Sequence, residues 1–263
     1  MGTILEQILE QKKQEVNFLR ENKSFIPEQH DERRSFIKKL QTAEELAIIA
    51  EFKRASPSKG IINNNVNPAE QAAAYEKFGA SAISVLTDQT FFKGSFADLK
   101  SVREAVELPI LCKDFIIDRI QIDEAAIQGA DLVLLIVAAL EDKRLIDLHQ
   151  YAKDLGLEIL VEVHNQNELE KAIRMGAELI GINNRDLKTF EVSLEVTEKL
   201  AALVKNSGAY LISESGIHVQ EDVKRVRNAG ANGILVGEAL MMSLDVKQTF
   251  SDIRMPISKE IRQ

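Results

Sequence analysis

The chain has 263 residues, of which 45% are hydrophobic and 28% are charged, and its 33 Lys and Arg stand against 41 Asp and Glu. This balance is typical of a folded globular protein and excludes a disordered chain. The net charge of −8 argues against a broad nucleic-acid or anionic-membrane surface, and the single cysteine excludes an intrachain disulfide.

The first 46 residues are predicted to form a helical extension. Residues 4–19 (ILEQILEQKKQEVNFL) carry apolar side chains at helical spacing, which predicts an amphipathic helix. A second, short helix is expected within residues 35–46, after a charged stretch at 21–34. We expect these helices either to cap the floor of the fold or to cover its mouth. The N-terminus is too charged for a signal peptide and no apolar run reaches the roughly 18 residues of a membrane span, so a cytoplasmic location is expected.

A repeated pattern organises the rest of the chain. Four times a helical segment ends in Gly-Ala and a short apolar run follows, at Gly79, Gly129, Gly176 and Gly230. Glycine just past a helix adopts the left-handed conformation that closes the last turn. The spacings of 50, 47 and 54 residues are about twice one strand-plus-helix unit, and a second apolar run lies inside each interval. Eight strands are therefore expected to begin near residues 47, 81, 109, 131, 157, 178, 209 and 232.

The segments between these strands are predicted helices, for example residues 68–78, with Asn67 as N-cap and Pro68 in the first turn. Nearly all-apolar strands that alternate with helices predict a parallel sheet covered by helices. Eight such units favour an α/β fold of the (β/α)₈ TIM barrel type over an open doubly wound sheet, since no GxGxxG motif opens the first unit. Without a Gly-, Ser- or Pro-rich linker, we expect one domain over residues 1–263, of which 1–46 is the extension.

Polar residues are found where the predicted strands end, which is where barrel enzymes keep their chemistry. Glu51 and Lys53 share one face at the end of the first strand because side chains alternate. Further strands end in Lys113, Glu162, Asn183 and Glu214. Each residue alone is compatible with a solvated strand end. Six of them together indicate a functional site, because burial of such groups is unfavourable unless they pair.

Glycines after the last two strands, in Ser215-Gly216 and Gly237-Glu238, suit a phosphate held by backbone N–H groups, although ordinary tight turns would carry the same pattern. The loop SPSKG at residues 56–60 is either a lid over an anion or a polar loop, and we favour phosphate recognition.

Cys112 is expected to face the helix layer as an inert apolar residue. His164 either joins the site or is a satisfied or exposed loop histidine, and we favour the second interpretation. The four scattered histidines include no two at helical ligand spacing, so no metal site is expected.

Together the motifs resemble those of the indole-3-glycerol-phosphate synthase family. The matching segments cover nearly the whole chain and are IIAEFKRASPSKG, SAISVLTD, FFKGSFADL, PILCKDFIID, LVEVHNQNELEKA, IGINNRDL, ISESGI and LVGEALM. The resemblance implies a (β/α)₈ barrel with an N-terminal helical segment. It implies ring closure, decarboxylation and dehydration of 1-(2-carboxyphenylamino)-1-deoxyribulose 5-phosphate to indole-3-glycerol phosphate, in tryptophan biosynthesis. It also implies no metal or organic cofactor, and we expect a monomer whose partner is this phosphosugar–anthranilate substrate.

The same resemblance implies catalytic roles. Lys113 is similar to the general acid that protonates the ketone, and Glu162 to the acid/base group of the later proton transfers. Lys53 is similar to the lysine that contacts the substrate carboxylate and has been proposed as an acid for dehydration. Glu51 would hold Lys53, and Asn183 would orient a substrate hydroxyl. We expect burial to draw the pKa of Lys113 down toward the working pH.

Further positions match the family's substrate- and phosphate-binding residues. They are Ser56, Phe92, Phe115, Arg185, Leu187, Glu214, Ser215, Gly216, Ile217, Gly237 and Glu238.

Three other functions remain as alternatives. A phosphosugar isomerase of the same pathway would need a Cys/Asp-type acid–base pair, and the outward orientation expected for Cys112 argues against it. An aldolase would form a Schiff base through Lys53 or Lys113. A non-catalytic ligand-binding barrel would bind an anion without turnover.

Overall fold

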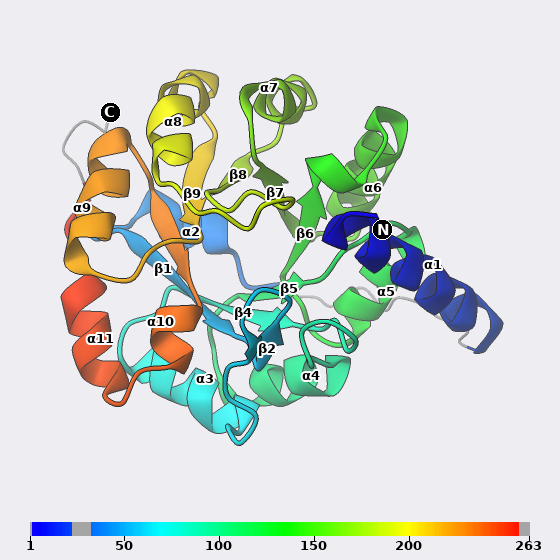
Figure 1. Cartoon of the computed structure of the whole chain (residues 1–263), viewed down its shortest axis with the longest axis horizontal. Helices are drawn as coiled ribbons and strands as arrows, with labels where there is room; N and C mark the ends of the chain where they lie inside the picture. The colour runs from blue at the N-terminus through cyan, green and yellow to red at the C-terminus, as the bar shows by residue number, and fades with distance from the viewer. Residues whose placement is uncertain (1, 23–32, 258–263) are drawn as a thin grey trace.

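Eight parallel strands close into a barrel in the computed structural model, which describes residues 2–22 and 33–257 (Figure 1). The first barrel strand, β1, pairs with β4 on one side and with the last strand, β10, on the other, which closes the ring. Every strand begins within one residue of its predicted start, so the predicted (β/α)₈ TIM barrel is confirmed. The strands are β1 (Ala47–Phe52), β4 (Ala82–Leu86), β5 (Ile110–Lys113), β6 (Leu132–Ile136), β7 (Glu158–Val163), β8 (Leu179–Asn183), β9 (Tyr210–Glu214) and β10 (Gly233–Val236).

Helices surround the barrel and follow the strands in turn (Figure 1). The Asn67 side chain accepts hydrogen bonds from the Ala69 and Glu70 amides and so caps the first of them, as predicted. The glycine of each Gly-Ala pair has a φ between 79° and 119°, the left-handed conformation expected at a helix end. The helices are α3 (Pro68–Lys77), α4 (Phe96–Ala105), α5 (Arg119–Ile127), α6 (Asp142–Asp154), α7 (Gln166–Arg174), α8 (Glu195–Ser207), α9 (Gln220–Ala229), α10 (Glu238–Met241) and α11 (Val246–Ile253), with a 3₁₀ turn, η1 (Val137–Ala139).

Alternation along each strand divides the core into two layers. Ile49, Leu111 and Leu132 belong to the apolar cluster inside the barrel. Their outward neighbours belong to a larger cluster between the strands and the helices, and Cys112 lies there, as predicted. Burial raises the pKa of the Cys112 thiol to about 12, which fits an inert residue.

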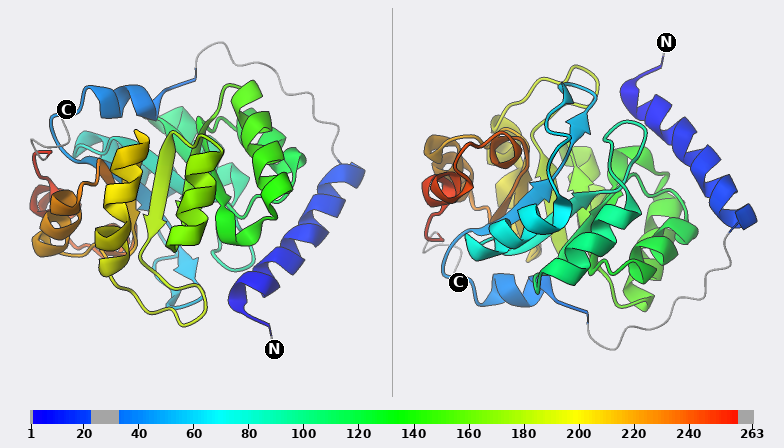
Figure 2. Two further views of the ribbon diagram at one scale, coloured as in Figure 1. Left: turned by 90° about the horizontal axis from the view of Figure 1, so that it is seen from above. Right: turned by 90° about the horizontal axis from the view of Figure 1, so that it is seen from below.

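The two N-terminal helices lie at opposite ends of the barrel (Figure 2). Helix α2 (Phe36–Gln41) caps the floor, where Phe36 is fully buried against the interior cluster. Glu158, at the start of β7, accepts hydrogen bonds from the amides of Phe36 (2.9 Å) and Ile37 (3.1 Å) and so fixes this helix. Helix α1 (Ile4–Asn22) has its N-terminal end at the mouth. Both expected positions are therefore occupied, one by each helix, while most of the charged stretch between them lies outside the described residues.

The loop after β1 contains a small two-stranded hairpin. Strand β2 (Ala55–Ser56) pairs antiparallel with β3 (Gly60–Ile61), and SPSKG forms the turn between them. Among the helices that the structure describes, none is long and apolar enough to cross a membrane.

We predict that Phe36→Ala lowers the free energy of unfolding by about 3–5 kcal/mol, because it removes a buried ring from the barrel floor. Urea unfolding of the variant measures this loss. Lys38→Ala, at an exposed position of the same helix, is the control and should change stability little. Equal stability of the two variants would show that α2 does not seal the floor.

Candidate active site

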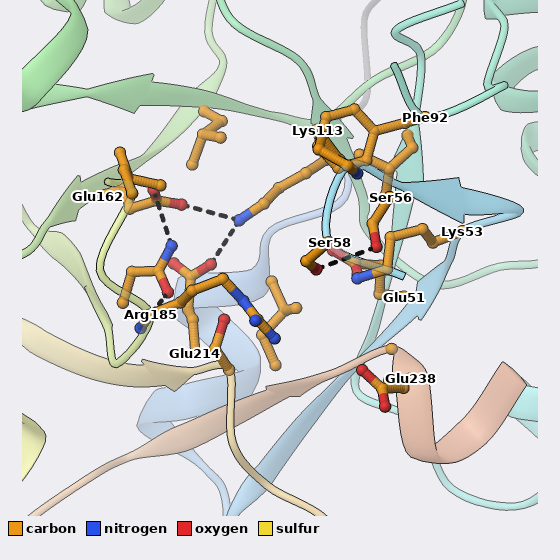
Figure 3. A pocket seen from close by; sticks show the side chains of 18 of the residues that line it. Glu51, Lys53, Ser56, Ser58, Phe92, Lys113, Glu162, Arg185, Glu214 and Glu238 are labelled. Atoms are coloured by element: carbon orange, nitrogen blue, oxygen red, sulfur yellow. Dashed lines mark hydrogen bonds and ion pairs between the residues drawn. The ribbon is translucent and has the colours of Figure 1, made fainter. Parts of the chain in front are cut away.

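One cavity, at the carboxyl ends of the strands, is lined by all the catalytic and substrate-binding residues that the family resemblance implies (Figure 3). Helix α1 adds a further apolar wall through Ile4, Leu5 and Ile8, which were not among the predicted site residues. The predicted residues that line the cavity are Glu51, Lys53, Ser56, Phe92, Lys113, Phe115, Glu162, Asn183, Arg185, Leu187, Glu214, Ser215, Gly216, Ile217, Gly237 and Glu238.

Lys113 occupies the centre of the polar wall. Its Nζ lies 3.0 Å from Glu162 Oε2 and also forms an ion pair with Glu214 Oε2. The second carboxylate oxygen of Glu162 accepts a hydrogen bond of 3.1 Å from the Asn183 side chain. Lys113, Asn183 and Glu214 end β5, β8 and β9, and Glu162 is the last residue but one of β7. Figure 3 shows the side chains of Lys113, Glu162 and Glu214 converging. The barrel therefore assembles this group from residues up to 101 positions apart.

The expectation of a lowered pKa for Lys113 is wrong. Burial by itself lowers the pKa of this ammonium, but the nearby carboxylates of Glu214, Glu162 and Glu51 outweigh burial and raise it. Lys113 is therefore charged at neutral pH, which is the state that a proton donor needs.

The Lys113 ammonium faces two buried carboxylates, and their pKa values shift in opposite directions. Burial raises the pKa of Glu162, but the opposing effects of Lys113, His164 and Asn183 are larger and the net pKa falls. At Glu214, Lys113 lowers the pKa, but burial and the nearby charge of Glu162 raise it by more, to about 7. Glu214 Oε1 is buried without a hydrogen-bond partner among the described residues. Glu214 is thus the carboxyl that holds a proton most readily.

Glycine makes room for two of these carboxylates. A Cβ added at Gly181, on β8, would lie 2.0 Å from Glu214 Oε1, and one added at Gly237 would lie 2.4 Å from Glu51 Oε1. Larger residues at either position would displace the carboxylate beside them.

A second ion pair lies across the cavity from Lys113. Lys53 Nζ is 2.6 Å from Glu51 Oε1, and both residues are on β1 or directly after it. The hairpin that follows adds hydroxyls, with Ser56 Oγ 3.5 Å from Ser58 Oγ, and Lys59 Nζ lies 3.3 Å from Glu238 Oε1. The cavity therefore has cations on both sides and hydroxyls at the β1 edge.

His164 lies behind Glu162 rather than in the cavity wall. Its Nδ1 is 3.1 Å from Glu168 Oε2, in the first turn of α7, so this histidine is satisfied next to its loop. Its Nε2 is 3.3 Å from Glu162 Oε1, so it also contacts the site. Burial lowers the pKa of His164, but the two carboxylates outweigh burial and raise it to about 10. The imidazolium therefore supports the charge on Glu162.

Asn184 was also missed, because its neighbour Asn183 has the inward position on the strand. The buried Asn184 amide donates to Ser213 Oγ and to the carbonyl oxygens of Glu214 and Ser215, at 2.9 to 3.1 Å. Ser215 has a φ of 65°, unusual for a residue other than glycine, so this bond helps to hold a strained turn at the cavity.

Part of the cavity wall is aromatic. Phe92, in the loop after β4, and Phe115, in the loop after β5, have ring centroids 5.9 Å apart. With the α1 side chains they form an apolar half of the cavity beside the polar half around Lys113.

Comparison with known proteins links this arrangement to one family. A family model described as indole-3-glycerol phosphate synthase matches residues 5–253. The indole-3-glycerol phosphate synthase of Bacillus mycoides (strain KBAB4) is 54% identical over 257 residues, covering 98% of this chain and 100% of the relative. The protein of the same name from Bacillus thuringiensis subsp. konkukian (strain 97-27) is 53% identical with the same coverage.

Two solved structures share the fold at low sequence identity. Thiamine phosphate pyrophosphorylase from Pyrococcus furiosus has a TM-score of 0.59 at 19% identity and covers 82% of this chain and 95% of its own. N-acetylmannosamine-6-phosphate 2-epimerase from Clostridium perfringens has a TM-score of 0.62 at 17% identity and covers 86% and 99%. At these identities the likeness concerns the fold alone.

The raised pKa of Glu214 predicts a pH-dependent stability. Between about pH 4.5 and 7 the folded chain holds a proton on Glu214 that the unfolded chain has released, so this residue's contribution to stability falls as pH rises. Glu214→Gln removes the effect. The stability of the wild type relative to this variant should fall across that window by at most about 1.4 kcal/mol per pH unit.

Urea unfolding of both proteins at several pH values measures the difference. Glu170→Gln, at an exposed position on α7, serves as the control. If the difference in free energy of unfolding between the wild type and Glu214→Gln stays constant with pH, the raised pKa of Glu214 is contradicted.

Proposed function

This chain belongs to the indole-3-glycerol phosphate synthase family, and from that premise we propose how its side chains divide the work of the reaction. The reaction closes the ring of 1-(2-carboxyphenylamino)-1-deoxyribulose 5-phosphate and releases carbon dioxide and water. Its product is indole-3-glycerol phosphate, an intermediate of tryptophan biosynthesis.

Lys113 is the general acid of the first step. The aromatic carbon that bears the carboxylate attacks the ketone carbon, and the Lys113 ammonium donates a proton to the ketone oxygen as this bond forms. The observation that carries this assignment is the position of Lys113, charged and held between Glu162 and Glu214 at the centre of the cavity. A donor fixed before the substrate arrives needs little rearrangement in the transition state.

Glu162 serves the later proton transfers. Loss of carbon dioxide restores the aromatic ring, and dehydration then removes a proton from the methylene carbon next to nitrogen and the hydroxyl from the former ketone carbon. Glu162 is charged and adjacent to Lys113, so the pair supplies a base and an acid for this step, after water has returned to Lys113 the proton that it gave to the ketone oxygen. Asn183 fixes the Glu162 carboxylate at 3.1 Å and is placed to orient a substrate hydroxyl.

The remaining residues bind the two anionic ends of the substrate. Lys53, steadied by Glu51, pairs with the substrate carboxylate and is a second candidate acid for dehydration. Arg185 adds a further cation at the cavity wall. The phosphate is held at the β1, β9 and β10 ends by Ser56, Ser215, Gly216, Gly237 and Glu238, the last through its backbone amide. Binding the phosphate away from the ring contributes energy that orients the reacting atoms.

The aromatic half of the cavity receives the anthranilate ring. Phe92 and Phe115 stand close enough to contact one planar ring, and Leu187 and Ile217 extend the apolar lining.

We also propose a cytoplasmic monomer that acts on this small molecule and not on nucleic acid. The net charge of −8 supports the exclusion of nucleic acid. Every proposed site residue comes from one chain, so the site needs no second copy. The proposal treats residues 1–263 as one domain, since α1 lines the cavity and α2 closes the floor of the same barrel.

We predict that Lys113→Ala lowers kcat by about 10²–10⁴-fold, the usual contribution of a positioned acid. Steady-state assay of indole-3-glycerol phosphate formation by its indole fluorescence measures the loss. Lys100→Ala, at an exposed position on α4, is the matched control and should retain wild-type turnover. Near-normal turnover by Lys113→Ala would refute the role.

We predict that Glu162→Gln lowers kcat more than it raises KM, because the amide keeps the shape of the side chain but exchanges no proton. The same assay, run over a range of substrate concentrations, separates the two parameters. A rise in KM with kcat unchanged would assign Glu162 to binding alone.

A further inference from the structure

One buried lysine outside the cavity, Lys12, connects helix α1 to two loops that carry cavity residues. Lys12 lies on the apolar face of α1, four residues from both Ile8 and Val16, and its side chain is 1% exposed. Its Nζ lies 2.7 Å from Asp114 Oδ1, 2.9 Å from Asp88 Oδ2 and 2.8 Å from Glu15 Oε2. Asp88 follows β4 and Asp114 follows β5, so this ammonium joins α1 to two barrel loops.

Each of these aspartates in turn holds the backbone of a cavity phenylalanine. Asp88 Oδ1 accepts hydrogen bonds from the amides of Phe91 (2.6 Å) and Phe92 (3.1 Å). Asp114 Oδ1 accepts one from the amide of Phe115 at 2.7 Å. The side chains of Phe92 and Phe115 form the aromatic wall of the cavity. Lys12 is therefore connected to the backbone of each phenylalanine through one aspartate, which pairs with the ammonium and accepts the phenylalanine amide.

The third wall of the apolar half comes from α1 itself. Ile8, one turn before Lys12, lines the cavity together with Ile4 and Leu5. The buried ammonium thus fixes the distance between this helix and the two phenylalanine loops. A second ion pair joins α1 to the barrel, between Arg20 and Asp118 at 2.7 Å, but Arg20 is 58% exposed and lies far from the cavity end of the helix.

We propose that Lys12 is a positioning residue that sets the width of the apolar half of the cavity and so the affinity for the aromatic ring of the substrate. This inference rests on the proposed placement of the anthranilate ring against Phe92 and Phe115. Among the described residues that line the cavity Lys12 is absent, so it acts through the loops and not by touching the substrate.

The energetics favour a permanent cation at this place. Burial lowers the pKa of Lys12, but Asp114 and Asp88 outweigh burial and raise it. Without the ammonium, two buried carboxylates would repel each other and move toward solvent. That movement would carry the amides of Phe92 and Phe115 with it. The phosphate end of the cavity lies at β1, β9 and β10, and of these only β1 adjoins β4.

A comparison of two ligands tests this. Lys12→Met removes the ammonium, and Lys13→Met removes one from the next residue, which is 64% exposed and pairs with Glu10. The first ligand is the carboxyphenylamino-deoxyribulose phosphate substrate. The second is ribulose 5-phosphate, which has the pentulose and the phosphate but no ring, measured as a competitive inhibitor. Thermal unfolding of each variant verifies that it is folded at the assay temperature.

We expect Lys12→Met to raise KM for the substrate about tenfold or more while the Ki of ribulose 5-phosphate changes less than about threefold. Lys12→Arg, which keeps the charge, should recover part of the affinity, and Lys13→Met should match the wild type. A KM unchanged by Lys12→Met, or an equal loss for both ligands, would overturn the proposal. A lower melting temperature with both affinities intact would leave Lys12 a purely structural role and overturn it as well.

A second variant covers the case in which Lys12→Met does not fold. Asp88→Asn keeps an oxygen for the Phe91 and Phe92 amides but removes one charge that pairs with Lys12, and it should raise KM for the substrate in the same selective way. An unchanged KM would then overturn the inference. If the wild type converts the substrate and the variants bind it normally, only the role of Lys12 fails. If the wild type does not convert it, the proposed function fails.

Discussion

The sharing of one ammonium between two buried carboxylates is the interaction on which the site depends. Lys113 Nζ pairs with both Glu162 and Glu214, and neither pairing is achievable without the barrel, because the three residues lie at the carboxyl ends of three different strands, Glu162 one residue before the end. Isolated burial of any of them would be strongly unfavourable. Mutual pairing keeps Lys113 charged and divides the carboxylates into one that is ionised and one that readily takes a proton.

The rest of the fold protects this arrangement from two sides. Helix α2 seals the floor through Phe36, far from the chemistry, so the barrel is stabilised by contacts that play no part in the reaction. At the mouth, Gly181 leaves space for Glu214, and Asn184 fixes the backbone turn at Ser215. Helix α1 completes the apolar half and is tied down by Lys12. Contacts at the floor of the barrel thus stabilise the fold, while the cavity at the opposite end holds the reactive groups, as is usual for barrel enzymes.

Much of this was accessible from the sequence because barrel geometry makes side-chain direction periodic. Once Lys113 is taken to point inward because it is a charged residue at a strand end, alternation predicts that Cys112 points outward, and the structure confirms both positions. The direction of the Lys113 pKa shift was predicted wrongly. It depends on how many carboxylates surround the ammonium, and one of them, Glu214, is 101 residues away in the sequence. The hairpin β2–β3 was missed because its strands have only two residues each, too few to show a period. A signal for Lys12 was present, as a charge on the apolar face of α1 between Ile8 and Val16, but its partners are set by tertiary structure.

The central claim is that Lys113 delivers a proton to the ketone oxygen, and a crystal structure with an unreactive substrate analogue tests it most directly. An analogue in which the ketone is reduced to an alcohol keeps the oxygen in place but does not cyclise. We predict this oxygen within hydrogen-bond distance of Lys113 Nζ, with the aromatic ring against Phe92 and Phe115. An oxygen bound to Lys53 instead, with Lys113 still paired only to its carboxylates, would contradict the account.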